Sequence, residues 1–207
     1  MVSHDEIKND TLGMINHTKE MLEIIYDGFR KHNLSSIGKV EEVEEKLYKD
    51  SECLLKSILG ERSNEDIKHF VTVPEHFDRT GKGLNQLFNA TRKKIREDML
   101  FSDKSIKEAY KLFDEIQELL TCLDDCITTK NRVLAEHINE NGKKLCDLAD
   151  EYAIFHEERL IAGVCVPKSA PIYLDILDSF RNILWHIREI AVNILAGCGE
   201  DREEKSK

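Results

Sequence analysis

The stretch from Pro171 to Leu195 constrains the fold more than any other part of the chain. Its apolar residues recur at spacings of three and four: Tyr173, Ile176, Phe180, Ile183, Ile187, Ile190 and Ile194. A period near 3.5 residues is typical of a helix that lies along other helices in a bundle. Leu177, Leu184 and Ala191 widen the apolar stripe, which predicts a deeply buried helix that touches two neighbours.

The same spacing recurs earlier in the chain, so the sequence predicts an all-α protein with six helices. The composition agrees, since only three prolines and ten glycines occur in 207 residues. Ser102 and Asp103 are expected to cap the fourth helix, and Gly60 and Gly163 to end the second and the fifth. Pro74 falls in the first turns of the third helix, where proline is tolerated. The predicted helices are Asp10–His32, Ile37–Leu59, Ile67–Met99, a fourth through Ile106 and Ile127, Asn131–Ala162 and Pro171–Leu195.

The third and sixth helices align with each other at a shift of 103 residues. This shift places Phe77 on Phe180 and Gly60 on Gly163. The matching glycines and the matching order of helices indicate a duplicated three-helix unit. We therefore predict two tandem antiparallel three-helix bundles, residues 1–101 and 102–200, followed by a charged tail, residues 201–207.

Charge and cysteine usage narrow the class of protein. The formal net charge of −10 argues against binding to nucleic acid or to an anionic membrane surface. No apolar run approaches the ~20 residues that cross a bilayer, and MVSHDEIKND lacks the basic start and apolar core of a signal peptide. The six cysteines include no CxxC pair and no zinc-finger spacing, which favours free thiols in a reducing compartment. We expect a cytoplasmic protein without membrane insertion.

Two segments resemble a known family. The stretches PEHFDRTGKGLNQL in the third helix and LDSFRNILWHIREIAVNI in the sixth resemble the PhoU-type helix, with its pattern Leu-Glu-Arg-Ile-Gly-Asp-His followed by Asn-Ile-Ala. HEERLIAGVCVPKSAPIYLDIL is similar to the segment before that motif in PhoU-like domains of sodium–phosphate cotransporters. The resemblance covers most of the chain. It implies a cytoplasmic, dimeric regulator of phosphate uptake that contacts membrane partners and is not an enzyme.

Metal binding is the family property that this sequence retains least. Many PhoU-like proteins bind metal through a paired E(D)xxxD motif on the third and sixth helices. Here Asp78 is kept, but Lys82 replaces the second carboxylate, and Arg181 and Trp185 stand at the acidic positions of the second copy. A hard multivalent cation needs several oxygen ligands. We therefore expect no cofactor, and a salt bridge between Asp78 and Lys82 in place of the ion.

Asp50 is the second candidate metal ligand, because family members often carry an acid in that part of the second helix. It falls on the apolar seam of the helix, and a buried carboxylate needs a partner. Lys82 and Arg79 are the candidate partners, and the alternative is that Asp50 faces solvent at the bundle edge. If a divalent metal or iron is held, the resemblance assigns it to Asp78 and Asp50.

Other notable residues have structural interpretations. Arg159 is expected to pair with acids on its own helix. Gly81–Gly83 forms a GKG stretch that lacks the GxxxxGK[ST] frame of a phosphate loop, so it predicts close helix packing. Trp185 is expected to fill space between the bundles or, if exposed, to contact a partner. No serine or cysteine has a placed base, so no catalytic residue is assigned.

The sequence and its resemblance together predict an accessory or regulatory protein for inorganic phosphate transport. It would act as a homodimer whose helical faces dock on a membrane phosphate transporter or a sensor protein. Two alternatives stay open. One is a metal-binding helical bundle with a di- or trinuclear centre on the remaining carboxylates, and the other is a structural adaptor unrelated to phosphate.

Overall fold

Six long α-helices make up nearly all of the chain that the computed structural model describes, residues 4–60 and 70–200, with side chains for 5–60 and 70–194. No strand occurs within these ranges. Short 3₁₀ helices, Leu34–Ile37 and Pro167–Ser169, precede α2 and α6. The α-helices are α1 (His4–Lys31), α2 (Val40–Gly60), α3 (Val73–Arg96), α4 (Asp103–Thr129), α5 (Arg132–Ile161) and α6 (Ala170–Glu200).

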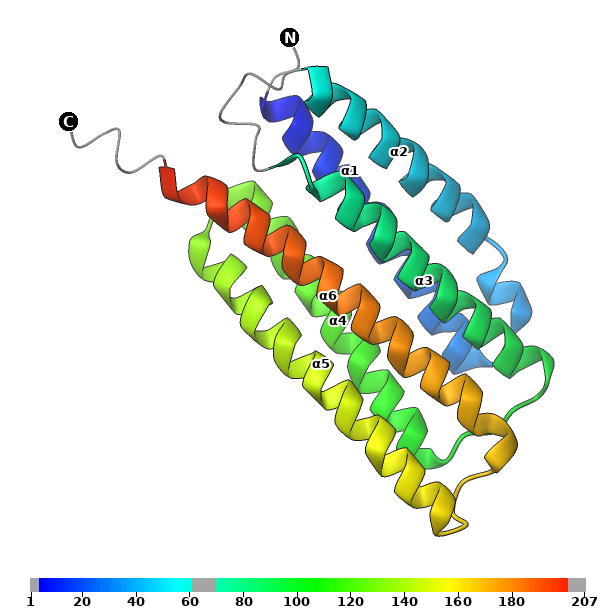
Figure 1. The fold of residues 1–207 in the computed structure, drawn as a ribbon. Coiled ribbons are helices and arrows are strands. Elements are labelled where there is room, and N and C mark those ends of the chain that lie inside the picture. The colour runs from blue at the N-terminus through cyan, green and yellow to red at the C-terminus, as the bar shows by residue number, and fades with distance from the viewer. Residues whose placement is uncertain (1–3, 61–69, 201–207) are drawn as a thin grey trace.

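The helices form two three-helix bundles that lie side by side (Figure 1). Helices α1, α2 and α3 form one bundle and α4, α5 and α6 form the other, with sequential helices antiparallel. Helices α3 and α6 run antiparallel along the seam between the bundles, and α1 contacts α4 across the same seam. The predicted all-α fold of two antiparallel bundles is confirmed. Its division into repeats at residues 101 and 102 stays a prediction.

The stripe on α6 is the buried centre of the second bundle. None of its ten apolar residues from Tyr173 to Ile194 is more than 6% exposed, which confirms the prediction from spacing. Burial of a large apolar side chain stabilises a fold by roughly 1.5–3 kcal/mol. This one helix therefore contributes a large part of the stability.

The close approach of α3 and α6 depends on Gly83. A Cβ atom added there would lie 2.9 Å from Ile183 Cγ1 and 3.5 Å from the backbone nitrogen of Ile183. A side chain on residue 83 would push the two helices apart, because protein interiors have little free volume. The GKG stretch is thus a helix-packing element, as predicted.

The helix ends follow local rules. The Ser102 hydroxyl accepts a hydrogen bond from the backbone N–H of Ser105 at 3.2 Å, which confirms the predicted cap of α4. Asn131 caps α5 in the same way. Gly163, with φ of +70°, follows α5 and supplies the left-handed conformation that ends many helices. The residues after Gly60 lie outside the described part of the chain.

Three predicted helix starts differ from the structure. Helix α1 begins at His4 rather than Asp10, since Ile7 extends the buried stripe toward the N-terminus. Helix α3 begins at Val73, because Pro74 lacks a backbone N–H and fits only the first turn; residues 67–69 lie outside the described part. Helix α2 begins at Val40, after the 3₁₀ turn that contains Ile37.

Candidate functional site

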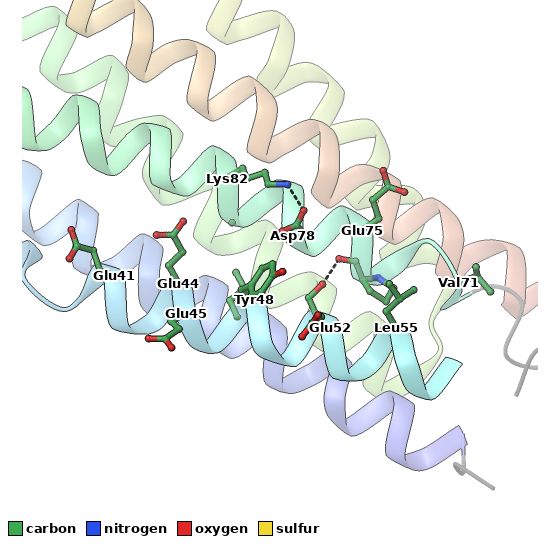
Figure 2. A pocket seen from close by; sticks show the side chains of 14 residues that line it. Glu41, Glu44, Glu45, Tyr48, Glu52, Leu55, Val71, Glu75, Asp78 and Lys82 are labelled. Atoms are coloured by element: carbon green, nitrogen blue, oxygen red, sulfur yellow. Dashed lines mark hydrogen bonds and ion pairs between the residues drawn. The ribbon is translucent and has the colours of Figure 1, made fainter. Parts of the chain in front are cut away.

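A groove of about 830 Å³ opens between α2 and α3. Six carboxylates and one lysine line it together with apolar side chains. Figure 2 shows Glu41 and Glu44 of α2 pointing toward α3, which carries Asp78 and Lys82, whereas Glu45 and Glu75 point away from the space between the two helices. The lining residues are Glu41, Glu44, Glu45, Leu47, Tyr48, Ser51, Glu52, Leu55, Val71, Pro74, Glu75, Asp78, Gly81 and Lys82.

Two contacts at the base of the groove hold its walls together. The Ser51 hydroxyl donates a hydrogen bond to the Pro74 carbonyl at 2.8 Å, and both residues are buried. A Cβ atom on Gly81 would lie 3.2 Å from Leu47 Cδ2, so α3 approaches α2 closely at this point. The groove is therefore a fixed feature of the packing between α2 and α3.

The groove also presents apolar surface. Tyr48 is 55% exposed, Leu55 is 38% exposed and Val71 is 39% exposed. An acidic rim around exposed aromatic and aliphatic side chains is the surface that a basic amphipathic segment matches.

Two of the rim carboxylates, Glu45 and Glu75, pair with cations one turn away on their own helices. Lys49 hydrogen-bonds to Glu45 at 2.6 Å from one turn away on the same helix, which lowers the pKa of the Glu45 carboxyl below its usual value. Arg79 pairs in the same way with Glu75 at 3.0 Å. Exposed pairs of this kind contribute little to stability. A partner's cations can replace them at small cost.

Asp78 lies in the groove and is bound to Lys82. The ammonium of Lys82 donates to Asp78 Oδ2 at 2.6 Å, which confirms the predicted salt bridge across one helical turn. The ammonium stands where a second carboxylate would be needed. A metal cluster of the PhoU type does not fit here, because the lysine charge repels a cation.

The second copy of the motif is equally altered. Arg181 pairs with Asp150 and Asp178. Trp185 is 47% exposed and lies against the rings of His76 and His186. Within residues 5–60 and 70–194, no group of three or more His, Cys, Asp or Glu side chains is placed to hold a metal ion.

Asp50 does not join Asp78. Its Oδ2 lies 2.9 Å from Nδ1 of His17 on α1, a contact that becomes an ion pair when His17 is protonated. The Asp50 side chain is 41% exposed, at the edge of the bundle. Of the two alternatives for Asp50, the position facing solvent at the bundle edge is the one observed, and the pairing with Lys82 or Arg79 does not occur, because this face of α2 is turned toward α1. The structure thus separates the two candidate ligands.

A buried polar network escaped the sequence analysis. Arg159 of α5 donates two hydrogen bonds to Glu108 of α4, at 2.9 and 2.7 Å, and the Tyr173 hydroxyl of α6 donates to the same carboxylate at 2.6 Å. The prediction that Arg159 pairs on its own helix is wrong. Glu108 lies three residues after Ser105 and four before Leu112, on the buried face of α4, and this spacing was the available signal.

The network joins three helices, α4, α5 and α6, through buried side chains. Glu108 and Arg159 side chains are only 5% and 12% exposed. Burial, and then the Glu108 carboxylate, raise the pKa of Tyr173 far above its usual value. The tyrosine is therefore a fixed hydrogen-bond donor at every physiological pH.

Two packed antiparallel three-helix bundles with α3 and α6 at the seam define the PhoU-type fold. The structure is similar to that of PhoU from Pseudomonas aeruginosa, with a TM-score of 0.80 over 93% of this chain and 95% of that chain. The two sequences are 11% identical, so the likeness is one of fold. No protein-family model matches the sequence, and no curated protein matches it either.

The comparison confirms the predicted PhoU-like fold. The described helices include none that is both long enough and apolar enough to cross a bilayer.

Proposed function

We propose that this chain is a cytoplasmic accessory protein that regulates inorganic phosphate transport. It acts by docking the α2–α3 groove on a basic amphipathic segment of a membrane phosphate transporter or of a sensor protein. The observation that carries the proposal is the acidic, partly apolar groove on a PhoU-type fold. The homodimer stays a prediction.

The charge of the groove favours a membrane protein as the partner. Cytoplasmic loops of membrane proteins carry an excess of Lys and Arg. A rim with six carboxylates attracts such loops and speeds encounter, and the exposed Tyr48 and Leu55 add apolar contact. An adaptor for an unrelated basic protein is the competing function.

Charge reversal in the groove tests the proposal in native cells. The gene is deleted and replaced by wild type, by Glu41→Lys/Glu52→Lys in the groove, or by Glu118→Lys/Glu140→Lys in the second bundle. All four positions are exposed, and both pairs change the net charge equally. Phosphate uptake is measured at high and low phosphate, and proteins that co-purify with each variant are identified.

Wild type and the second-bundle variant should restore normal uptake and recover a transporter or sensor subunit in an amount that depends on phosphate. The groove variant should do neither. Normal uptake in the deletion strain would contradict a role in phosphate transport and favour the adaptor. Full activity of the groove variant would show that another surface docks.

A further inference from the structure

Two histidines from different bundles meet across the seam. His76 of α3 and His186 of α6 have their Nδ1 atoms 3.2 Å apart, and both side chains are half-buried. The close approach of Gly83 to Ile183 fixes the register of these helices nearby. The pair is therefore held by the packing of the whole seam.

The separation of the two nitrogens matches a shared metal ion. Imidazole nitrogens bind zinc at about 2.0–2.1 Å, so two of them in a tetrahedral site lie about 3.3 Å apart. Without an ion, two neutral imidazoles in this position share one hydrogen bond, in which one Nδ1–H faces the lone pair of the other. Both arrangements fit the observed distance between the two nitrogens.

The surroundings favour neutral imidazoles with available lone pairs. Burial, then His76 and Arg79, lower the pKa of His186 to about 4, and burial also lowers the pKa of His76. The carboxylates of Glu189 and Glu75 act in the opposite direction and raise the pKa of His76. The guanidinium of Arg79 lowers this pKa and is itself paired with Glu75. Metals bind the neutral form of histidine.

We propose that His76 and His186 chelate one divalent transition-metal ion across the seam between the bundles. Imidazole suits zinc, nickel and copper, whereas the carboxylate clusters of the family suit harder ions. Because only two protein ligands converge here, water completes the coordination shell. The ion joins α3 to α6 and so stabilises the native arrangement of the bundles.

Trp185 is a built-in reporter for this site. It is the one tryptophan of the sequence, and its ring centroid lies 4.7 Å from that of His186 and 5.8 Å from that of His76. Paramagnetic Ni²⁺ at the pair should quench its fluorescence. Diamagnetic Zn²⁺ should displace Ni²⁺ and restore the signal.

The experiment titrates the full chain, first treated with a chelator, with Ni²⁺ and then with Zn²⁺. His76→Gln and His186→Gln are compared with His137→Gln, which alters an exposed histidine of α5. Circular dichroism verifies that each variant is folded. Calorimetry with Zn²⁺ on the wild type gives the stoichiometry without any variant.

Wild type and His137→Gln should show saturable quenching at one equivalent, reversed by Zn²⁺. Loss of even an outer partner of a metal site weakens binding about 10–100-fold, so each ligand variant should bind at least about tenfold more weakly. Quenching that does not saturate, or that is equal in all variants, overturns the proposal, as does calorimetry without a one-to-one event. The pair is then a hydrogen bond between two imidazoles only.

Discussion

Lys82 Nζ and Asp78 Oδ2 lie 2.6 Å apart across one turn of α3, on the wall of the acidic groove. At the position where the PhoU-type motif that the sequence resembles has a carboxylate, this chain has a lysine, and an ion pair within one helix occupies the place of a cation site. Other acids of the groove pair with exposed cations of the chain itself, such as Glu45 with Lys49 and Glu75 with Arg79, and these weak pairs can give way to the cations of a partner. This pair therefore makes one wall of the groove unsuited to a cation, while the acids around it suit the proposed docking function.

Asp78→Asn should change the stability of the protein only slightly. The side chains of Lys82 and Asp78 are 68% and 26% exposed, and pairs one turn apart on a helix contribute about 0.2–0.5 kcal/mol. Urea denaturation followed by circular dichroism measures the change. A loss of several kcal/mol would show that Asp78 has a further partner.

Metal analysis of the same variant separates the two metal hypotheses. A carboxylate centre at Asp78 predicts stoichiometric metal that disappears in Asp78→Asn. Metal bound by the histidine pair should survive this change and disappear in His186→Gln. Purified wild type is compared with both variants after equal exposure to zinc and iron.

Glu108→Gln should destabilise the protein by about 3–5 kcal/mol, because it leaves the buried Arg159 guanidinium without a counter-charge. Tyr173→Phe removes one hydrogen bond to that carboxylate and should cost about 1.5–3 kcal/mol. Urea denaturation of both variants measures these losses. The matched control is Glu136→Gln, which breaks the exposed pair of Glu136 with Arg132 and should cost less than about 1 kcal/mol.

A small effect of Glu108→Gln, similar to that of Glu136→Gln, would contradict the buried network. It would mean that, in the Glu108→Gln variant, the Arg159 guanidinium reaches water or another carboxylate.

Local rules made much of the fold predictable. The stripe on α6, the Ser102 cap and the Gly163 terminus depend on residues close together in sequence, and each was placed correctly. Side-chain partners from other helices were not predictable in the same way. Arg159 pairs with Glu108, and Asp50 contacts His17, because of how each helix is rotated about its axis relative to its neighbours. The spacing of apolar residues within one helix does not determine that rotation.

The candidate site was also predictable only where its residues are close together in the sequence. The sequence identified Asp78 and Lys82 as a pair because they share one helix turn. It did not reveal the groove, since this depends on how Ser51 and Gly81 set α2 against α3. The contact of His76 with His186 likewise arises only from the antiparallel register of the seam.

Two glycines should respond in opposite ways to substitution by alanine. Gly13 in α1 has open space around it, so Gly13→Ala should raise the stability by about 0.5–1 kcal/mol through helix propensity. In Gly83→Ala the new methyl would meet Ile183, and overpacking of about 1–3 kcal/mol exceeds the same gain. Thermal unfolding of both variants tests this. Stabilisation by Gly83→Ala would show that α3 and α6 separate readily.

His156 should make the fold sensitive to acid. It is 2% exposed, its ring centroid lies 4.6 Å from that of Tyr173, and neither ring nitrogen has a hydrogen-bond partner in the described structure. Burial, followed by the charge of Arg159, lowers the pKa of His156 in the folded state. The unfolded chain binds the proton with a pKa near 6.5.

Because the folded pKa is the lower one, the unfolded state binds more protons as the pH falls below about 6.5, and stability decreases by up to about 1.4 kcal/mol per pH unit. His156→Phe removes this term, so its stability relative to wild type should increase steadily from pH 7 toward pH 5. Urea denaturation across that range, with a chelator present, measures the difference in the free energy of unfolding between variant and wild type. The contributions of the other titrating groups are the same in both proteins and cancel in this difference. His137→Phe, at an exposed position, should follow wild type. Parallel curves for His156→Phe and wild type would mean that the imidazole is protonated within the fold and paired with Glu108.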